Sequence, residues 1–511
     1  MKTPQLFLII SLIVCNNCLG QIVKTVIGPD AGNLGGCLLV LKNGNVIFSS
    51  QDRKTSIYKL EVFNSDLIKI NEKELNYKTP SLDKAYSKSK QTAYKQKIYE
   101  IGDKIVIFEM DNKIDGKKEC GLYRIIMNST NLEIEKEELI LKVNRAGSAV
   151  SSPYKDEYGL DSPFFYITKD ENSDYYAIIK YGYQKRDDAE SHFEVHHYSP
   201  EHKEISNAKF DYLNNQYNYA RPLNFTVYAD KYVILISSVF NSEHRLTMDT
   251  KIVLSKLEKG KTEFIHRELD FTKNFDSDYC AMKKNEKHNT LEVLVYNKEG
   301  ANMTKILYSL IFQSLDPEKM VLNKMYVMPR NKLDNFAVNN CNINKGYGNG
   351  MISDYYINNN GNIVATSVKN VFSLVQGDAL SGDPELIGFC EFDNSGNDIN
   401  AWAYPHFGNG VITTFSNEKG NFSLINEIAE NMETPLNSKF KDTFEKEKNA
   451  ILLTLKDNGE IQRQYVFGKP EKKKNIFIKR GYFDRRSKTY IAWLSSGKDD
   501  KNEKIALIKF Q

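Results

Sequence analysis

Short apolar runs rich in β-branched and aromatic residues, separated by polar turns, repeat along almost the whole chain. Two examples are the turn 43–45 before Val46 and the turn 102–104 before Ile105. Polar turns between runs of this composition are typical of β-hairpins. The same arrangement of a polar turn followed by an apolar run recurs near Tyr175, Tyr232, Leu291, Ile363, Val411 and Tyr490. Since Val46 and Tyr490 are 444 residues apart, seven steps average about 63 residues each.

A second apolar run follows the first in every step. We place it at 57–60, 122–126, 193–195, 252–257, 306–308, 371–374, 451–455 and 505–508. Many of these runs are followed by another turn and a weaker run, so each step holds material for four strands. Helical periodicity is scarce. Residues 437–449 suit a short helix, although their many charges suit a solvated insertion equally well.

Repeats of four antiparallel strands with this length predict an all-β β-propeller, in which each repeat is one blade. Residues 21–511 hold nearly eight steps, which favours eight blades, with seven as the alternative. Here the chain resembles exported bacterial β-propeller proteins, over about residues 37–511. The resemblance lies in the rhythm of the blades. The Trp-Asp dipeptide, the paired kelch glycines and the sialidase Asp-box are missing, so it implies no subfamily.

Two other β-rich architectures are compatible with the same strand pattern. One is a pair of β-sandwich domains, and the other is a solenoid. A sandwich pair predicts a break in composition near the middle of the chain, and the sequence has none. We therefore treat residues 21–511 as one propeller domain.

The two ends of the chain carry complementary parts of a blade. The last unit holds three runs, 476–478, 490–493 and 505–508, and is one strand short. Residues 22–27 form a spare strand, in which Val23 and Ile27 are expected to face the interior. An open ring would leave exposed sheet edges. We therefore predict that this segment is the outer strand of the last blade.

Residues 1–20 have the features of a secretory signal peptide. Lys2 supplies the positive charge, 6–14 form the apolar centre, and 18–20 offer small residues before a cut that leaves Gln21 first. The apolar stretch is too short to span a membrane. No apolar run elsewhere in the chain is longer. The expected location is secreted or periplasmic. A buried N-terminal strand is the alternative interpretation.

Composition restricts the class of protein more than its activity. Hydrophobic residues make up 41% and charged residues 26%, which is typical of a globular chain. The net charge of +3 gives no overall attraction to nucleic acid, so no nucleic-acid partner is expected.

Five cysteines follow the signal segment: Cys37, Cys120, Cys280, Cys341 and Cys390. They are too sparse for a disulfide scaffold, and a Cys341–Cys390 bond stays open as an alternative.

A possible calcium loop lies at residues 170–174. Asp170, Asn172 and Asp174 alternate as oxygen ligands do in a calcium loop. An EF-hand loop then needs Gly at its sixth position and Glu at its twelfth, where this chain has Tyr175 and Tyr181. The same residues are also ordinary turn residues. We expect no resident cofactor, with calcium at this loop as the alternative.

Two groups of aromatic residues beside polar ones are candidates for a ligand-binding face. They are Tyr217, Tyr219 and Arg221, and Trp402, Tyr404 and His406. The alternative is that these aromatic side chains pack between blades, as strand aromatics commonly do.

The sequence contains no G-x-S-x-G elbow, no H-E-x-x-H motif and no Walker loop. We therefore expect a non-catalytic binding or scaffold propeller of the cell envelope or exterior, with a protein or carbohydrate ligand on one face. The alternative is a hydrolase or lyase acting on a glycan or peptide, with acidic residues brought to the propeller axis from different blades. Such a scattered site would leave no motif in the sequence.

Overall fold

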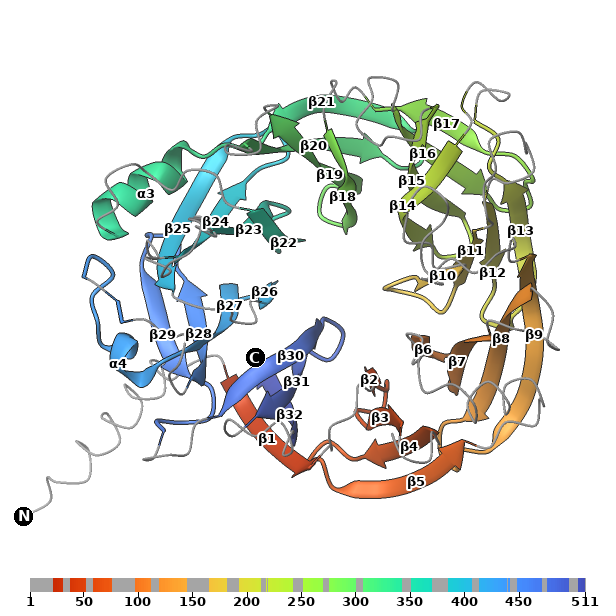
Figure 1. Cartoon of the computed structure of the whole chain (residues 1–511), viewed down its shortest axis with the longest axis horizontal. Helices are drawn as coiled ribbons and strands as arrows, with labels where there is room; N and C mark the ends of the chain where they lie inside the picture. Colours follow the sequence, from red (N-terminus) through yellow and green to blue (C-terminus); the bar gives the residue numbers. More distant parts are fainter. Residues whose placement is uncertain are drawn as a thin grey trace, which may run out of the picture.

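The computed structural model is a ring of eight four-stranded antiparallel sheets around a central axis (Figure 1). The prediction of an eight-bladed β-propeller is confirmed. The structure describes residues 22–30, 37–51, 58–75, 97–111, 119–144, 165–181, 193–212, 217, 219–241, 251–269, 275–299, 307–341, 351–369, 385–406, 413–438, 440–441, 448–470, 476–495 and 504–510.

The first four blades follow one another along the chain. The first contains β2 (Cys37–Val40), β3 (Val46–Gln51), β4 (Tyr58–Phe63) and β5 (Lys69–Leu75). The second contains β6 (Lys97–Ile101), β7 (Lys104–Asp111), β8 (Glu119–Asn128) and β9 (Ile134–Asn144). The third contains β10 (Phe165–Lys169), β11 (Tyr176–Lys180), β12 (Glu194–Tyr198) and β13 (Glu204–Lys209). The fourth contains β14 (Tyr219–Tyr228), β15 (Tyr232–Phe240), β16 (Lys251–Glu258) and β17 (Ile265–Glu268).

The remaining blades complete the ring. The fifth contains β18 (Phe275–Asn285), β19 (Thr290–Glu299), β20 (Leu307–Asp316) and β21 (Val321–Val327). The sixth contains β22 (Met351–Ile357), β23 (Ile363–Lys369), β24 (Glu385–Phe392) and β25 (Asp398–His406). The seventh contains β26 (Thr413–Asn417), β27 (Gly420–Glu427), β28 (Asn449–Leu455) and β29 (Ile461–Tyr465). The eighth contains β30 (Phe477–Asp484), β31 (Thr489–Ser495), β32 (Lys504–Phe510) and β1 (Ile22–Asp30).

The first strand of each blade lies nearest the axis, and the fourth lies at the outer side (Figure 1). The hydrophobic cores lie between neighbouring blades, because each middle strand is covered on both faces. One core joins Ile47 and Leu60 of the first blade to Ile105 and Ile125 of the second. Every residue of β15 is buried, whereas the outer strand β13 alternates between exposed and buried positions. The two patterns differ because β15 is covered on both faces, whereas β13 is covered on one face only.

The turns between first and second strands share one backbone feature. Seven of these eight turns contain or adjoin a residue with positive φ: Gly44, Gly102, Ala229, Asn289, Gly361, Gly420 and Lys488. At Gly361, where φ is +82°, an added Cβ would also lie 2.4 Å from His288 Nε2 in the neighbouring blade. The turn 170–175 of the third blade is different. It has no such residue in the described chain, and it spans six residues between β10 and β11.

One strand prediction differs from the structure, and two other predictions fall wholly or partly outside the described residues. The predicted run 371–374 lies outside the described residues, and the third strand of the sixth blade is β24. The start expected near Val411 precedes the inner strand β26, so the second strand of that blade begins only at Gly420. The described residues of the helix considered at 437–449 are not helical, and β28 begins at Asn449. A short helix, α4 (Ala429–Met432), lies upstream. Residues 439 and 442–447 are outside the described set.

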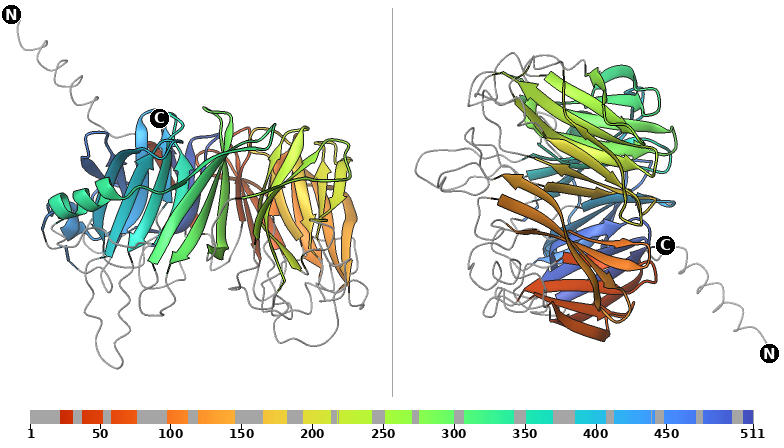
Figure 2. Two further views of the ribbon diagram at one scale, coloured as in Figure 1. Left: turned by 90° about the horizontal axis from the view of Figure 1, so that it is seen from above. Right: turned by 90° about the vertical axis from the view of Figure 1, so that its right-hand side faces the viewer.

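The helix α3 (Asn331–Cys341) was not predicted, and it packs against β25 at the outer side of the ring (Figure 2). Its buried residues Leu333, Ala337 and Cys341 recur every four positions and form one narrow face among polar residues.

Cys120, Cys280, Cys341 and Cys390 are free thiols, so the Cys341–Cys390 disulfide does not form. The Cys37 side chain lies outside the described set. No helix in the described part of the chain is long and apolar enough to cross a membrane.

β1 pairs antiparallel with β32 and is the outermost strand of the eighth blade, whose order is β1-β32-β31-β30 (Figure 1). Val26 packs against the core that the eighth blade shares with the first, while Ile27 is 42% exposed. The expectation that Ile27 faces inward is therefore wrong. A register shift between Ile22 and Lys24 moves the inward positions by one residue, as a β-bulge does.

We predict that β1 contributes substantially to stability. Deleting residues 21–28 is expected to lower the free energy of unfolding by several kcal/mol, since apolar burial is lost and β32 becomes an exposed edge. Val26→Asp is expected to cost about 2–4 kcal/mol because it places a charge in the shared core. Ile27→Asp is the matched control on the same strand, and it is expected to cost less than about 1 kcal/mol. Urea unfolding measures these losses of stability. Equal losses for the two point variants would contradict the placement of Val26, and not Ile27, on the buried side of β1.

Candidate functional site

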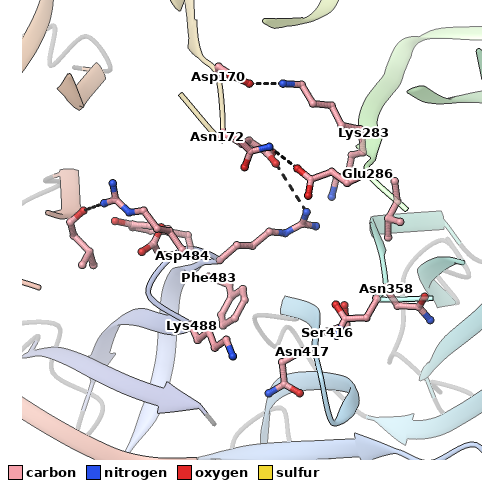
Figure 3. A pocket seen from close by; sticks show the side chains of 18 of the residues that line it. Asp170, Asn172, Lys283, Glu286, Asn358, Ser416, Asn417, Phe483, Asp484 and Lys488 are labelled. Carbon is pink, nitrogen blue, oxygen red and sulfur yellow. Dashed lines mark hydrogen bonds and ion pairs between the residues drawn. The ribbon is translucent and has the colours of Figure 1, made fainter. Parts of the chain in front are cut away.

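A cavity of about 1050 Å³ opens on the axis, where the turns between first and second strands converge (Figure 3). Seven of the eight blades contribute described residues to its wall, and the fourth blade does not. The wall holds seven basic residues: Lys169, Lys283, Lys284, Lys287, Arg485, Arg486 and Lys488. It holds six acidic residues: Glu100, Asp170, Glu171, Glu286, Glu418 and Asp484. The cavity is therefore densely charged but nearly neutral overall.

The turn 170–175 provides the most deeply buried charge in this wall. The Asp170 side chain is 3% exposed and forms an ion pair with Lys284, whose side chain is 10% exposed. Lys284 also donates a hydrogen bond to the carbonyl oxygen of Val227, and Asp170 accepts one from the Ser173 hydroxyl. Charge-assisted bonds away from water are stronger than exposed ones. These bonds connect the third, fourth and fifth blades beside the axis.

Asp174, at the other end of this turn, connects to the first and second blades. Its carboxylate lies 2.7 Å from Lys42 Nζ and 3.0 Å from Lys169 Nζ, and it accepts a hydrogen bond of 2.9 Å from the Gly102 N–H. Partial burial raises the pKa of Asp174, but the hydrogen bonds from Lys42, Lys169 and Gly102 outweigh this effect and hold the pKa below 3.8. Asp174 is therefore an ionised structural acceptor.

The turn between β30 and β31 brings three basic side chains to the cavity. Arg486 lies 3.2 Å from Glu100 and donates a hydrogen bond of 2.9 Å to the carbonyl oxygen of Val40. Lys488 lies 2.9 Å from Glu418 of the seventh blade. Arg485 lies 3.9 Å from Glu171 in the turn of the third blade. These contacts link the last blade to four others.

The structure brings the predicted calcium residues into the cavity but gives them separate partners. Asp170 pairs with Lys284, Asp174 pairs with Lys42 and Lys169, and the Asn172 amide donates to Glu286 (Figure 3). The ammonium groups occupy the surroundings that a bound cation would need. Among the described residues, no group of three or more His, Cys, Asp or Glu side chains could hold a metal ion.

The first aromatic candidate group lies away from the cavity. Tyr217 stacks on Tyr212 with ring centroids 5.9 Å apart, in a core of the third and fourth blades. Tyr219 begins β14, and its side chain lies outside the described set. Arg221 is half-buried on the same strand. Neither Tyr217 nor Arg221 is among the described residues that line the cavity.

The second aromatic group is buried between the sixth and seventh blades. Trp402 and Tyr404 are 0% exposed, and the Trp402 indole N–H donates a hydrogen bond of 2.8 Å to the carbonyl oxygen of Lys456. His406 is 1% exposed, with Nδ1 3.4 Å from Glu427. Burial raises the pKa of Tyr404. These side chains pack the interface between blades, which was the alternative interpretation, and none lies on an open face.

The sequence interpretation missed the charged turns 283–287 and 484–488 as candidates. Each is a dense mixture of basic and acidic residues at the end of a first strand and in the turn that follows it. All such turns lie at the same end of a propeller, so charge-rich turns at this position in each repeat were the available signal. Recognising them required the correct assignment of first and second strands within each repeat.

No protein-family model matches this chain, and no curated protein matches it. Among solved structures it is similar to the polysaccharide lyase Uly1, with 10% identity, a TM-score of 0.41, and coverage of 81% of this chain and 89% of that one. It is also similar to the β-propeller domain of the Trilobed protease from Pyrococcus furiosus, with 13% identity, a TM-score of 0.36, and coverage of 86% and 99%.

A third similar structure is Drosophila Plexin A in complex with Semaphorin 1b. The identity is 9% and the TM-score 0.35, with coverage of 96% of this chain and 87% of that one. At these identities and scores the likenesses transfer no activity to this chain.

We predict that the Asp170–Lys284 pair is a stability determinant. Lys284→Met leaves the buried Asp170 carboxylate without its ammonium partner, which is expected to cost about 3–5 kcal/mol. The control is Lys24→Met, because the Lys24 and Asp66 side chains are about half exposed, at 49% and 51%, and such pairs contribute about 0–1 kcal/mol. Chemical unfolding measures both variants. A loss for Lys284→Met no larger than the control would show that Asp170 is not held by this pair.

Proposed function

We propose that this chain is an exported, non-catalytic binding propeller whose ligand occupies the axial cavity. The observation that carries the proposal is the cavity itself. Its volume of about 1050 Å³ is just above the usual range of ligand pockets, about 300–1,000 Å³. Side chains from seven blades meet there, and propellers commonly carry their sites around the axis. The cavity's charged groups come from the hairpins of several different blades.

The charge arrangement supports binding over catalysis. A pair of catalytic carboxylates needs one group that stays protonated near neutral pH and one that is ionised. In this cavity Asp170 is paired with Lys284, and Glu100 with Arg486. The hydrogen bond from Lys488 lowers the pKa of Glu418 below 4.5. These carboxylates are therefore suited to holding the turns and meeting a polar ligand.

The alternative function is a hydrolase or lyase that acts on a glycan or peptide. One observation favours it: six acidic side chains surround a single cavity, as the sequence-based alternative required. Of these, Glu286 hydrogen bonds to an amide, that of Asn172, and Asp484 accepts from the Ser487 hydroxyl. They are the first residues to test for an acid or base role.

Export is part of the proposal and has a direct test. Expressed with its own N-terminus in a secreting host, the protein is expected outside the cytoplasm, beginning at Gln21. N-terminal sequencing and the intact mass of the exported material measure the cleavage site. A product that retains Met1 and stays in the cytoplasm would contradict the proposed location.

Binding and catalysis are separated by offering the same ligands in two assays. The protein is tested by calorimetry against neutral and acidic polysaccharides and against peptides, and the same mixtures are analysed for cleavage products. We expect heat of binding without product. Product formation that is lost in Glu286→Gln or Asp484→Asn, with the melting temperature unchanged, would establish the enzymatic alternative instead. Absence of binding to every member of the panel would overturn the proposed function.

A further inference from the structure

One side of the axial cavity combines an aromatic ring with hydrogen-bonding groups. Phe483 of the eighth blade, Lys488 of the following turn, and Ser416 and Asn417 of the seventh blade line the cavity where β26 and β30 are in contact (Figure 3). Phe483 is half-buried and stacks on Phe415, with ring centroids 4.3 Å apart and planes at 16°. Packing therefore holds this ring in a fixed orientation at the cavity wall.

An ion pair and hydrogen bonds hold the charged side chains next to this ring. Lys488 is paired with Glu418 across the two blades, and Asp484 is held by the N–H and hydroxyl groups of Ser487. The whole wall has seven basic and six acidic residues. Because basic and acidic residues are nearly equal in number, the wall offers a charged ligand little net attraction. The balance therefore favours an uncharged ligand.

A hydroxyl group suits such a wall because it both donates and accepts hydrogen bonds. It can accept from the Lys488 ammonium and donate to the Glu418 carboxylate without separating the pair. A sugar ring carries several hydroxyls at its edge and C–H groups on its face. The C–H groups can contact the face of an aromatic ring, while the hydroxyls bond to the polar groups around it.

We propose that the axial cavity binds an uncharged oligosaccharide, with one sugar ring against Phe483 between the turns of the seventh and eighth blades. This inference rests on the proposed function, because it names the ligand class of the same cavity. The sugar hydroxyls bridge Lys488 and Glu418, and Ser416 supplies a further hydroxyl at the cavity wall. The volume of about 1050 Å³ leaves room for further sugar units beyond the one at Phe483.

The test begins with an array of neutral and acidic oligosaccharides from plant, microbial and animal sources, together with acidic peptides. Calorimetry then measures the best neutral ligand at about 0.05 M and about 0.5 M NaCl. Because the ligand carries no charge, its affinity is expected to change less than about twofold with salt, whereas an anionic ligand would lose affinity through screening.

Three variants locate the ligand within the cavity. Phe483→Leu keeps an apolar side chain against Phe415 but removes the planar ring, and it is expected to weaken binding at least tenfold. Lys488→Gln is expected to weaken binding about three- to tenfold. Lys419→Gln is the matched control, since Lys419 is an exposed lysine of the adjacent turn that does not line the cavity, and it is expected to change affinity less than twofold. Thermal melting checks that each variant is folded.

Outcomes separate this inference from the proposed function. Preferred binding of acidic oligosaccharides or peptides, a strong salt dependence, or unchanged affinity in a folded Phe483→Leu variant would overturn the inference and leave a binding protein. Failure of every neutral oligosaccharide on the array would also overturn it. If no ligand of any class binds, the proposed function fails as well.

Discussion

The structure depends on the requirement that every blade be covered on both faces by a neighbour. The cores lie between blades, as between the first and second blades at Ile47 and Ile105. A blade with one uncovered face would expose a row of buried Val, Ile and Phe side chains to water. The ring must therefore close, and pairing of β1 with β32 completes the blade that joins the two ends. This antiparallel pairing joins residues from the two ends of the chain, as Ile22 with Phe510.

Near the axis the apolar packing gives way to charge pairing. The inner strands end in turns that face one another across the channel, and those turns carry mixed charges. Asp170 and Asp174, at the two ends of the turn 170–175, pair with Lys284 of the fifth blade and Lys42 of the first. Arg486 of the last blade contacts Glu100 of the second. These contacts hold separate hairpins in one arrangement, which gives the cavity a preorganised wall.

The same preorganisation bears on the choice between binding and catalysis. The carboxylates that hold the turns together, such as Asp170 and Glu100, form ion pairs with lysine or arginine and are therefore less suited to act as catalytic acids or bases. The side of the cavity near Phe483 is different, because its charged pairs are exposed to solvent, as the Lys488 and Glu418 side chains are at 43% and 78%. Exposed pairs are weak and can share hydrogen bonds with a ligand. The cavity thus combines a rigid side with a side suited to recognition.

The sequence by itself determined the local units of this protein. Turn residues and the strand pattern predicted four-stranded blades and their number, because these depend on neighbours within about 60 residues. The sequence did not determine strand phase where a bulge intervened, as at Ile27, nor the helix α3 with its narrow apolar face. It offered Trp402 and Tyr404 as candidates for a ligand-binding face and left packing between blades open, and the structure buries both between blades. It offered Asp170 and Asp174 as an alternative calcium loop, and it did not reveal that Lys284 and Lys42 reach them from elsewhere in the ring. The tertiary structure alone decided which turns face one another across the axis, because those contacts join residues 114 and 132 positions apart.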